Sequence, residues 1–189
     1  MSAGSANYKN LHILVTMAVM TAMAVILERV IRLDFGSARF SLACVCTMIS
    51  GLWFGPVCGG MVGGVQDVIG CLISGYPPNV LILISSTLYG VLPPLLFRAL
   101  KNRMKNRFFA LCISVAVTMA VCSFGFTMPG LILFYGYHPL VVLQMRLIQY
   151  VIMMPVYCVV LWALYESPLT KYVCSFIYEN DEPLRKESE

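Results

Sequence analysis

The chain has 189 residues, of which 59% are apolar and 12% are charged, and its formal net charge is +4. A soluble domain carries about twice this share of charged residues, so the composition predicts a protein whose solvent is lipid. One membrane crossing needs about 20 mainly apolar residues, which leaves room for roughly six crossings and excludes a separate soluble domain.

Hydropathy and turn residues divide the chain into six predicted membrane helices, so the expected fold is an all-α integral membrane bundle that forms a single domain. The first apolar stretch is longer than the core of a signal peptide and is kept as a crossing. The pair Gly55-Pro56 predicts the turn after the second crossing. Pro129-Gly130 and Gly136-Tyr137-His138-Pro139 predict the two ends of the connection after the fifth. The predicted crossings are residues 11–31, 40–54, 56–74, 78–100, 108–127 and 140–165, and a polar tail follows at 179–189.

Positive charge gathers in one connection and predicts the orientation of the bundle. The connections after the third and fifth crossings contain no lysine or arginine. Cytoplasmic loops are enriched in these residues, so the basic connection is expected in the cytoplasm. Six crossings then place both termini in the cytoplasm of a multi-pass cell-membrane protein. The basic residues, between the fourth and fifth crossings, are Arg98, Lys101, Arg103, Lys105 and Arg107.

The connection after the first crossing breaks this charge rule on the predicted outer face. It holds Glu28, Arg29, Arg32, Asp34 and Arg39. Local ion pairs, or arginine side chains that reach the membrane interface, would account for single residues. Three arginines against two acids still leave a positive surplus, which an anionic ligand arriving from outside would explain.

Asp67 is the clearest functional candidate within a crossing, because a charged residue at a helix centre costs about 2.5–3.5 kcal/mol on insertion scales. It lies one turn beyond the overlapping Gly-x-x-x-Gly pairs Gly59–Gly63 and Gly60–Gly64. The glycines are expected mainly to pack against a neighbouring helix. A buried carboxylate needs an arginine or the N–H groups of a ligand as its partner, so Asp67 is expected in or beside a polar pocket.

Polar and aromatic side chains recur at three- and four-residue steps on the fourth and sixth crossings, and each set forms a stripe on one helix face. Hydrogen bonding between helices alone would account for these stripes equally well. They comprise Asn79, Ser86 and Tyr89 on the fourth crossing and Arg146, Gln149, Tyr150, Met153 and Tyr157 on the sixth.

Several of these residues are expected to converge at similar depth near the outer ends of the first, third, fourth and sixth crossings. Arginine forks suit carboxylates, aromatic rings suit a flat heterocycle, and an aspartate suits an N–H edge. The implied ligand is a planar, nitrogen-rich ring that carries one or more carboxylates. The converging set is Arg29, Arg32, Asp67, Tyr76, Asn79 and Arg146.

The cysteines lie almost entirely inside apolar stretches, with no Cys-x-x-Cys pair and no neighbouring histidine. We interpret them as small buried apolar side chains, and we predict no metal site and no cofactor. On the first crossing, Ala18 and Ala22 form a small-x-x-x-small patch that suits docking against a helix of another membrane protein.

Short motifs recur along residues 39–100 and 145–164. They are Phe54-Gly55-Pro56, Gly59-Gly60, Gly63-Gly64, Asp67, Gly70, Tyr76-Pro77, Tyr89-Gly90, and Arg146-Leu147-Ile148 followed by Pro155. In order and spacing they resemble the substrate-binding (S) component of energy-coupling factor (ECF) vitamin transporters, in the folate branch. Pro78-Asn79 departs from the Pro-Gly-aromatic sequence expected there, and Leu143-Gln144-Met145 lacks a proline that the folate branch often has.

The resemblance implies a bundle that binds one vitamin from outside with high affinity and reorients when an ATPase module drives it. It implies docking through Ala18 and Ala22 onto the ECF transmembrane component, with ATP hydrolysed by two partner ATPase subunits. The chain has no phosphate-binding loop of its own, and no nucleic-acid partner is expected. Folate is the vitamin favoured, and another vitamin is the alternative. The expected substrate-binding residues are Arg29, Arg32, Arg39, Asp67, Tyr76, Asn79, Tyr89, Arg146 and Gln149.

An intramembrane enzyme and a stand-alone proton-coupled carrier are the competing classes. His12 and His138 lie near opposite membrane faces, and the chain has no His-Glu-x-x-His or Gly-x-Ser-x-Gly motif, which disfavours an enzyme. A carrier would use Asp67 as its proton site and would transport without ATP, but the chain is short for the inverted repeats usual in carriers.

Overall fold

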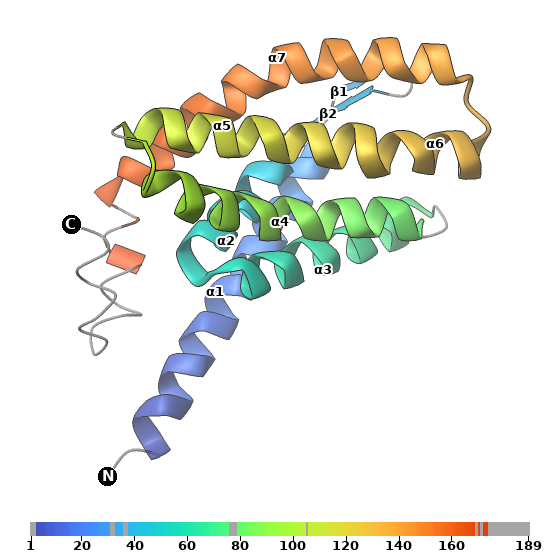
Figure 1. Ribbon diagram of the computed structural model, residues 1–189. Helices are drawn as coiled ribbons and strands as arrows, with labels where there is room; N and C mark the ends of the chain where they lie inside the picture. Colours follow the sequence, from blue (N-terminus) through green and yellow to red (C-terminus); the bar gives the residue numbers. More distant parts are fainter. Residues whose placement is uncertain are drawn as a thin grey trace.

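The computed structural model describes residues 3–30, 33–35, 38–75, 79–104, 106–168, 170 and 172–173. Helices lie side by side in an elongated bundle, and α1 projects from one end of it (Figure 1). The elements are α1 (Ala3–Val30), β1 (Leu33–Phe35), β2 (Ala38–Phe40), α2 (Ala43–Phe54), α3 (Pro56–Ser74), α4 (Val80–Lys101), α5 (Arg107–Ala120), the π-helix η1 (Val121–Thr127), α6 (Met128–Tyr135) and α7 (Pro139–Glu166).

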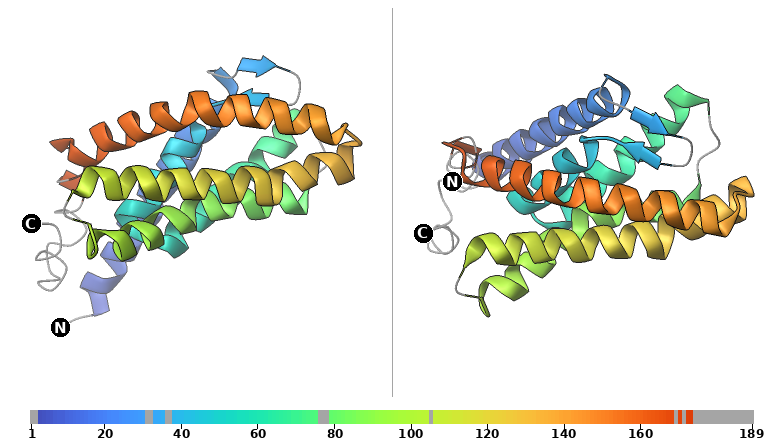
Figure 2. Two further views of the ribbon diagram at one scale, coloured as in Figure 1. Left: turned by 45° about the horizontal axis from the view of Figure 1, so that its top comes forward. Right: turned by 90° about the horizontal axis from the view of Figure 1, so that it is seen from above.

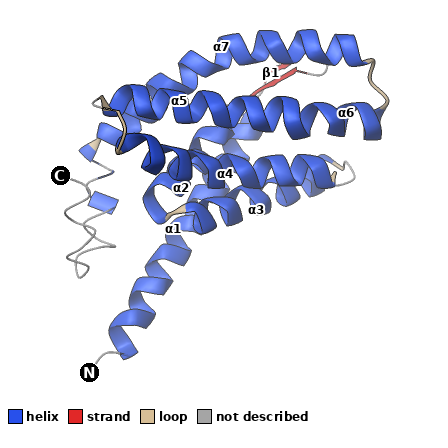
Figure 3. Ribbon diagram, in the orientation of Figure 1, coloured by secondary structure: helices blue, strands red, loops and turns tan. Residues whose placement is uncertain are grey.

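The bundle is helical, as predicted, with one small addition. Strands β1 and β2 form an antiparallel hairpin, red in Figure 3, in which Asp34 lies opposite Arg39. The amino-acid sequence alone does not predict this hairpin. Strands of three residues are too short to display the alternation of apolar and polar residues by which a strand is recognised.

Helix α2 is short compared with the long helices and the α5–η1–α6 segment that surround it. It has 12 residues and is therefore about 18 Å long, whereas the hydrocarbon core of a membrane is about 30 Å thick. Most of its side chains are buried against the surrounding helices, so its apolar composition serves contact with protein. The stretches of the described chain long and apolar enough to cross a membrane are the five segments Leu11–Glu28, Pro56–Ser74, Val80–Lys101, Arg107–Phe134 and Pro139–Glu166.

The fifth predicted crossing is longer than expected. Helices α5, η1 and α6 follow one another as a continuous rod beside α7 (Figure 2), so the helix continues past the predicted end at residue 127 and through Pro129-Gly130. The chain leaves the helix only at the second part of the predicted connection, Gly136-Tyr137-His138-Pro139. Pro129 lies inside this rod, directly after η1, and a local π-helical turn is one way in which a membrane helix accommodates the missing N–H group of a proline. The chain turns at Gly136, which has a φ of 65° and donates its N–H to the carbonyl of Ile132.

Glycines bring α3 and α4 into direct backbone contact. A Cβ atom on Gly59 would lie 2.5 Å from the carbonyl oxygen of Gly90, and one on Gly63 would overlap the carbonyl oxygen of Ser86. The prediction that these glycines serve helix packing is confirmed. Before this interface, Gly55 has a φ of 94°, a conformation that favours glycine, and so turns the chain from α2 into α3.

The two ends of the bundle differ in the charge of their connections. In Figure 1 the start of α1, the end of α7 and the connection from α4 to α5 lie at one end. The hairpin, the end of α3 and the loop from α6 to α7 lie at the other. The basic residues of the α4–α5 connection are therefore at the end opposite the hairpin.

Replacing Gly63 by alanine is expected to destabilise the protein by about 1–3 kcal/mol, because the new methyl group meets the backbone of α4. Thermal unfolding in detergent measures this loss. Gly64→Ala is the matched control, since its Cβ meets only the Thr87 hydroxyl, at 3.3 Å. Equal losses in the two variants would contradict the proposed backbone contact.

Candidate functional site

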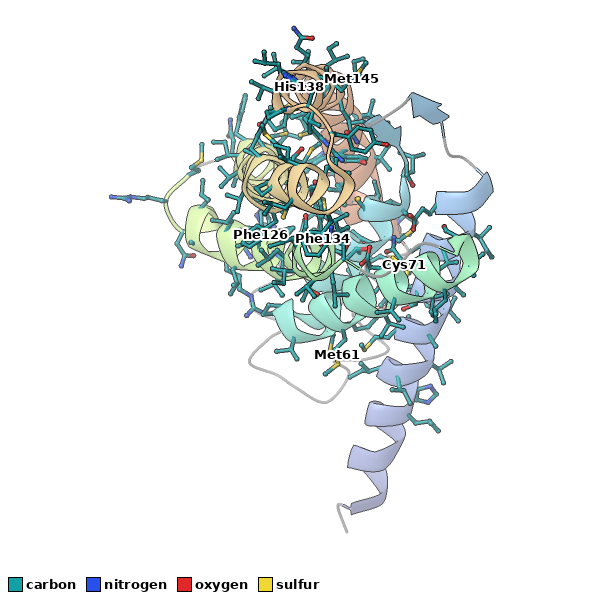
Figure 4. All side chains as sticks on the ribbon, turned by 90° about the vertical axis from the view of Figure 1, so that its right-hand side faces the viewer. Met61, Cys71, Phe126, Phe134, His138 and Met145 are labelled. Carbon is teal, nitrogen blue, oxygen red and sulfur yellow. The ribbon has the colours of Figure 1, made fainter. Side chains whose placement is uncertain are left out.

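A cavity of about 250 Å³ lies in the half of the bundle next to the hairpin. The end of α1, the start of α2, the second half of α3, the first half of α4, the α5–α6 rod and α7 all contribute to its wall. In the end-on view of Figure 4, Cys71, which lines the cavity, lies between His138 at the top of the bundle and Met61 at the bottom.

The wall of this cavity is rich in hydroxyl, amide and charged groups. Polar groups are costly inside a membrane protein and mark ligand and ion sites when they gather there. Small-molecule sites occupy about 300–1,000 Å³, so this space, at about 250 Å³, is slightly smaller than that range. The charged groups among the described lining residues are Glu28, Asp67 and Arg146.

Asp67 reaches the cavity from α3 because the glycine face beside it holds α3 against α4. Its Oδ1 atom accepts a hydrogen bond from the Ser86 hydroxyl of α4 at 3.2 Å, and its Oδ2 atom is buried. The glycine interface and the Asp67 contact therefore lie on the same face of α3. A carboxylate so placed can accept hydrogen bonds from N–H groups of a ligand.

Gln66, next to Asp67, joins three helices at the cavity wall. The Thr47 hydroxyl of α2 donates to its Oε1 at 2.7 Å, and its Nε2 donates to a carboxylate oxygen of Glu28 on α1 at 3.4 Å. This chain of hydrogen bonds fixes Glu28 beside the cavity and ties α1 to the bundle.

Arg146 enters from α7 and is 8% exposed. Its Nη1 donates to Oε1 of Gln149 at 3.2 Å, one helical turn away, and both residues line the cavity. Two tyrosines of the same stripe anchor α7. Tyr150 donates to the carbonyl of Ala116 at 3.1 Å, and Tyr157 donates to that of Ser41 at 2.6 Å.

Asn79 and Tyr89 place α4 against the cavity in different ways. Asn79 caps α4, because its Oδ1 accepts the N–H of Leu81 at 3.0 Å, and its Nδ2 donates to the carbonyl of Gly130 at 3.1 Å. Both polar ends of Asn79 thus have a structural role. The ring of Tyr89 lines the cavity and is half-buried.

The remaining expected substrate-binding residues are outside what the structure describes in atomic detail. Arg29 is at the end of α1 and Arg39 is in β2, but the side chains of both are outside the described part of the chain. Arg32 and Tyr76 lie outside the described residues altogether. The structure therefore brings together Asp67, Asn79, Tyr89, Arg146 and Gln149 from the expected set.

Sequence reasoning left several lining residues out of the expected site. The predicted set of binding residues does not contain Glu28, Gln66, Thr47, Ser123 or Thr127, which all line the cavity. In the sequence, Glu28 is marked only by its charge. A polar residue adjacent to an intramembrane aspartate would have been a usable signal for Gln66. Hydroxyl residues give no such signal, because serine and threonine also bond the carbonyls of their own helix.

The expected docking pair lies away from the cavity. Ala18 and Ala22 are exposed on α1, on a face that also exposes Val15 and Val19. Thr21 faces the bundle and donates to the carbonyl of Met17 at 2.8 Å. Small residues on an uncovered apolar face allow the close approach of another helix.

Comparison with known proteins agrees with this architecture. The folate transporter FolT of Clostridium novyi (strain NT) is 23% identical over 159 residues, which are 82% of this chain and 88% of that protein. The crystal structure of FolT bound with folic acid superposes with a TM-score of 0.64 at 21% identity and covers 80% of this chain and 90% of that one. The family of ECF transporter substrate-specific components matches residues 12–178. The resemblance in the sequence is thereby confirmed, and the chain belongs to the substrate-specific components of ECF transporters.

Proposed function

We propose that this chain captures folate from outside the cell as the S component of an ATP-driven uptake transporter. The observation that carries the proposal is the polar cavity, with Asp67 on one wall and Arg146 on another, in the half of the bundle opposite the basic α4–α5 connection. The relative named as a folate transporter and the fold shared with folic acid-bound FolT support this choice of vitamin.

The ring of folate enters the cavity and its glutamate portion remains at the mouth. A space of about 250 Å³ takes a bicyclic ring more easily than a whole folate molecule. Asp67 accepts hydrogen bonds from the N–H edge of the pterin, and the ring of Tyr89 supplies an aromatic face. Gln149 holds the guanidinium of Arg146, which serves either the ring or the carboxylate end. Asn79 shapes the wall from the start of α4.

The glutamate carboxylates meet arginines at the hairpin end. Arg29 lies in the last turn of α1 and Arg39 lies in β2, so their backbones are at the end of the bundle where the cavity lies. Arg32 and Tyr76 are further ligand-binding residues in this proposal. Arginine recognises carboxylates through paired hydrogen bonds, which suits the outer part of the ligand.

The chain crosses the cell membrane six times with both termini in the cytoplasm. Within the described residues, five helical segments are long enough to cross alone, and α2 together with the hairpin completes the sixth crossing in this proposal. The start of α1 and the end of α7 lie at the end that carries the basic connection, which supports this orientation.

Transport requires partners that hydrolyse ATP, because the chain has no phosphate-binding loop of its own. The chain itself does no chemistry on its ligand. The exposed face of α1 around Ala18 and Ala22 docks onto the ECF transmembrane component. Two ATPase subunits hydrolyse ATP and drive the reorientation that releases the vitamin. Another vitamin in the same cavity is the alternative within this family.

Purified protein is expected to bind folic acid tightly and to bind thiamine, riboflavin, biotin and pantothenate weakly, because only folate joins a pterin edge to two carboxylates. Titration calorimetry, or the fluorescence of Trp53 and Trp162, measures each affinity. Tight binding of one of the other vitamins would retain the family and overturn the folate assignment.

Asp67→Asn is expected to weaken folic acid binding by about 10- to 100-fold, since a charge-assisted hydrogen bond contributes about 1.5–3 kcal/mol. Glu166→Gln is the control, because Glu166 is exposed at the end of α7 and lies outside the cavity wall. Unchanged affinity in a folded Asp67→Asn protein would remove Asp67 from the site.

Replacing Arg29, Arg32 and Arg39 together by alanine is expected to weaken folic acid binding at least about tenfold and pteroic acid binding much less, because pteroic acid lacks the glutamate. Arg103→Ala, at the opposite end of the bundle, is the matched control. Equal losses for the two ligands would show that the arginines do not read the glutamate. The affinities of Arg146→Lys for folic acid and pteroic acid decide which part of folate Arg146 contacts. A loss for folic acid alone assigns Arg146 to the glutamate, and equal losses assign it to the ring.

A further inference from the structure

One row of cavity-lining residues has a spacing that an ordinary helix does not keep on one face. Met119, Ser123, Thr127 and Leu131 come from the α5–α6 rod at steps of four residues, and all of them are buried and line the cavity. An α-helix completes a turn in 3.6 residues, so four residues rotate by about 40° more than one full turn. After three such steps the last residue of the row would lie about 120° away from the face that the first residue occupies.

The π-helix η1 corrects this drift. It occupies seven residues, Val121–Thr127, in the middle of the row. Its wide turns hold more than four residues, because its hydrogen bonds span five, as Met128 N–H to the Ser123 carbonyl does. A step of four within η1 therefore falls short of a full turn and offsets the overshoot on either side. The π-helix keeps Leu131 on the cavity face together with Met119.

A clamp of three oxygen atoms holds this wide turn against α4. The Cys122 carbonyl accepts from the Thr127 hydroxyl at 2.9 Å and from the Ser85 hydroxyl of α4 at 3.1 Å, and the two hydroxyls are 2.9 Å apart. Two hydroxyl protons serve these three contacts, so two of them are hydrogen bonds at any moment.

Thr127 differs here from other threonines of the chain. Thr118 donates to Ser114 and Thr87 donates to Leu83, each four residues back within an α-helix. Thr127 reaches five residues back, and a serine of another helix joins it at the same carbonyl. The bond pattern thus stabilises the π-helical winding itself, with Ser85 and Cys122 almost fully enclosed.

We propose that Ser85 and Thr127 are positioning residues, and that their clamp on the Cys122 carbonyl holds η1 in the winding that determines which ring shape the cavity accepts. If the turn relaxed toward an α-helix, the residues after it would rotate about the rod, and Leu131 would leave the cavity face. Nothing in this step requires either hydroxyl to contact the ligand. The claim about ring shape rests on the proposed function.

The test uses Thr127→Val, which keeps the shape but removes the hydroxyl, together with Ser85→Ala and the conservative Thr127→Ser. Thr118→Val is the control, because Thr118 is buried on the same rod and its hydroxyl bonds only within α5. Two measurements are made on each purified full-length protein. The first is amide hydrogen exchange over residues 121–131 without ligand. The second is the ratio of affinities for folic acid, whose ring is flat, and 5-formyltetrahydrofolate, whose ring is puckered.

Thr127→Val and Ser85→Ala are expected to raise the exchange rate over 121–131 and to change the affinity ratio, each by about tenfold, the effect of losing one buried hydrogen bond. Thr127→Ser is expected to restore both, and Thr118→Val to leave both near wild type. Unchanged exchange in Thr127→Val would overturn the clamp, and an unchanged ratio with faster exchange would overturn its role in selection. A wild-type protein that binds neither compound would overturn the proposed function and the ring selection, while the exchange rates would still decide whether the clamp exists.

Discussion

The direct contact between the backbones of α3 and α4 sets the geometry of the rest of the bundle. Gly59 and Gly63 leave no room for side chains between the two helices, so α4 lies against α3 at the distance that the backbones allow. Close packing replaces the hydrophobic effect as the source of helix association in lipid, which makes this contact a main stabilising feature. One turn further along, the same interface brings the Asp67 carboxylate to Ser86 at the edge of the cavity.

The cavity depends on polar groups that satisfy one another while remaining open to a ligand. Gln66 links Glu28 to Thr47, and Gln149 holds Arg146. A buried polar group without a partner is costly in a surrounding of low polarity, so each of these contacts offsets part of the cost of burying these side chains. The side chains are thereby oriented before a ligand arrives, and less ordering remains to be paid on binding.

In the proposed function, ligand capture and partner docking use different faces of the same short chain. The polar half of the bundle encloses the cavity, while the outward face of α1 exposes Val15, Ala18, Val19 and Ala22. Thr21 and Ala24 on the opposite face hold α1 to the bundle. A substrate-specific component has to bind its ligand and engage its transporter, and this division leaves each surface free for one of these tasks.

The sequence by itself determined the class of the protein and its helical character. Hydropathy located the long helices, the glycine spacing identified the packing face of α3, and Asp67 was recognisable because a charge within an apolar stretch is rarely tolerated without a function. The family followed from motifs spread along most of the chain, and the comparisons agree with it. These features are local, and a local pattern is readable without knowing what lies beside it.

Only the tertiary structure decided the rest. Helix α2 is apolar, and an apolar helix has the same composition whether it faces lipid or is buried in protein. Its burial follows from the helices that surround it. The rod from α5 to α6 runs through Pro129 because the π-helix directly before it accommodates a proline there. Gln66, Ser123 and Thr127 became candidates when residues distant in sequence closed around one cavity. Hydrogen bonds between helices fixed their roles, and such bonds depend on helix rotation and depth, which a single sequence does not encode in any local pattern.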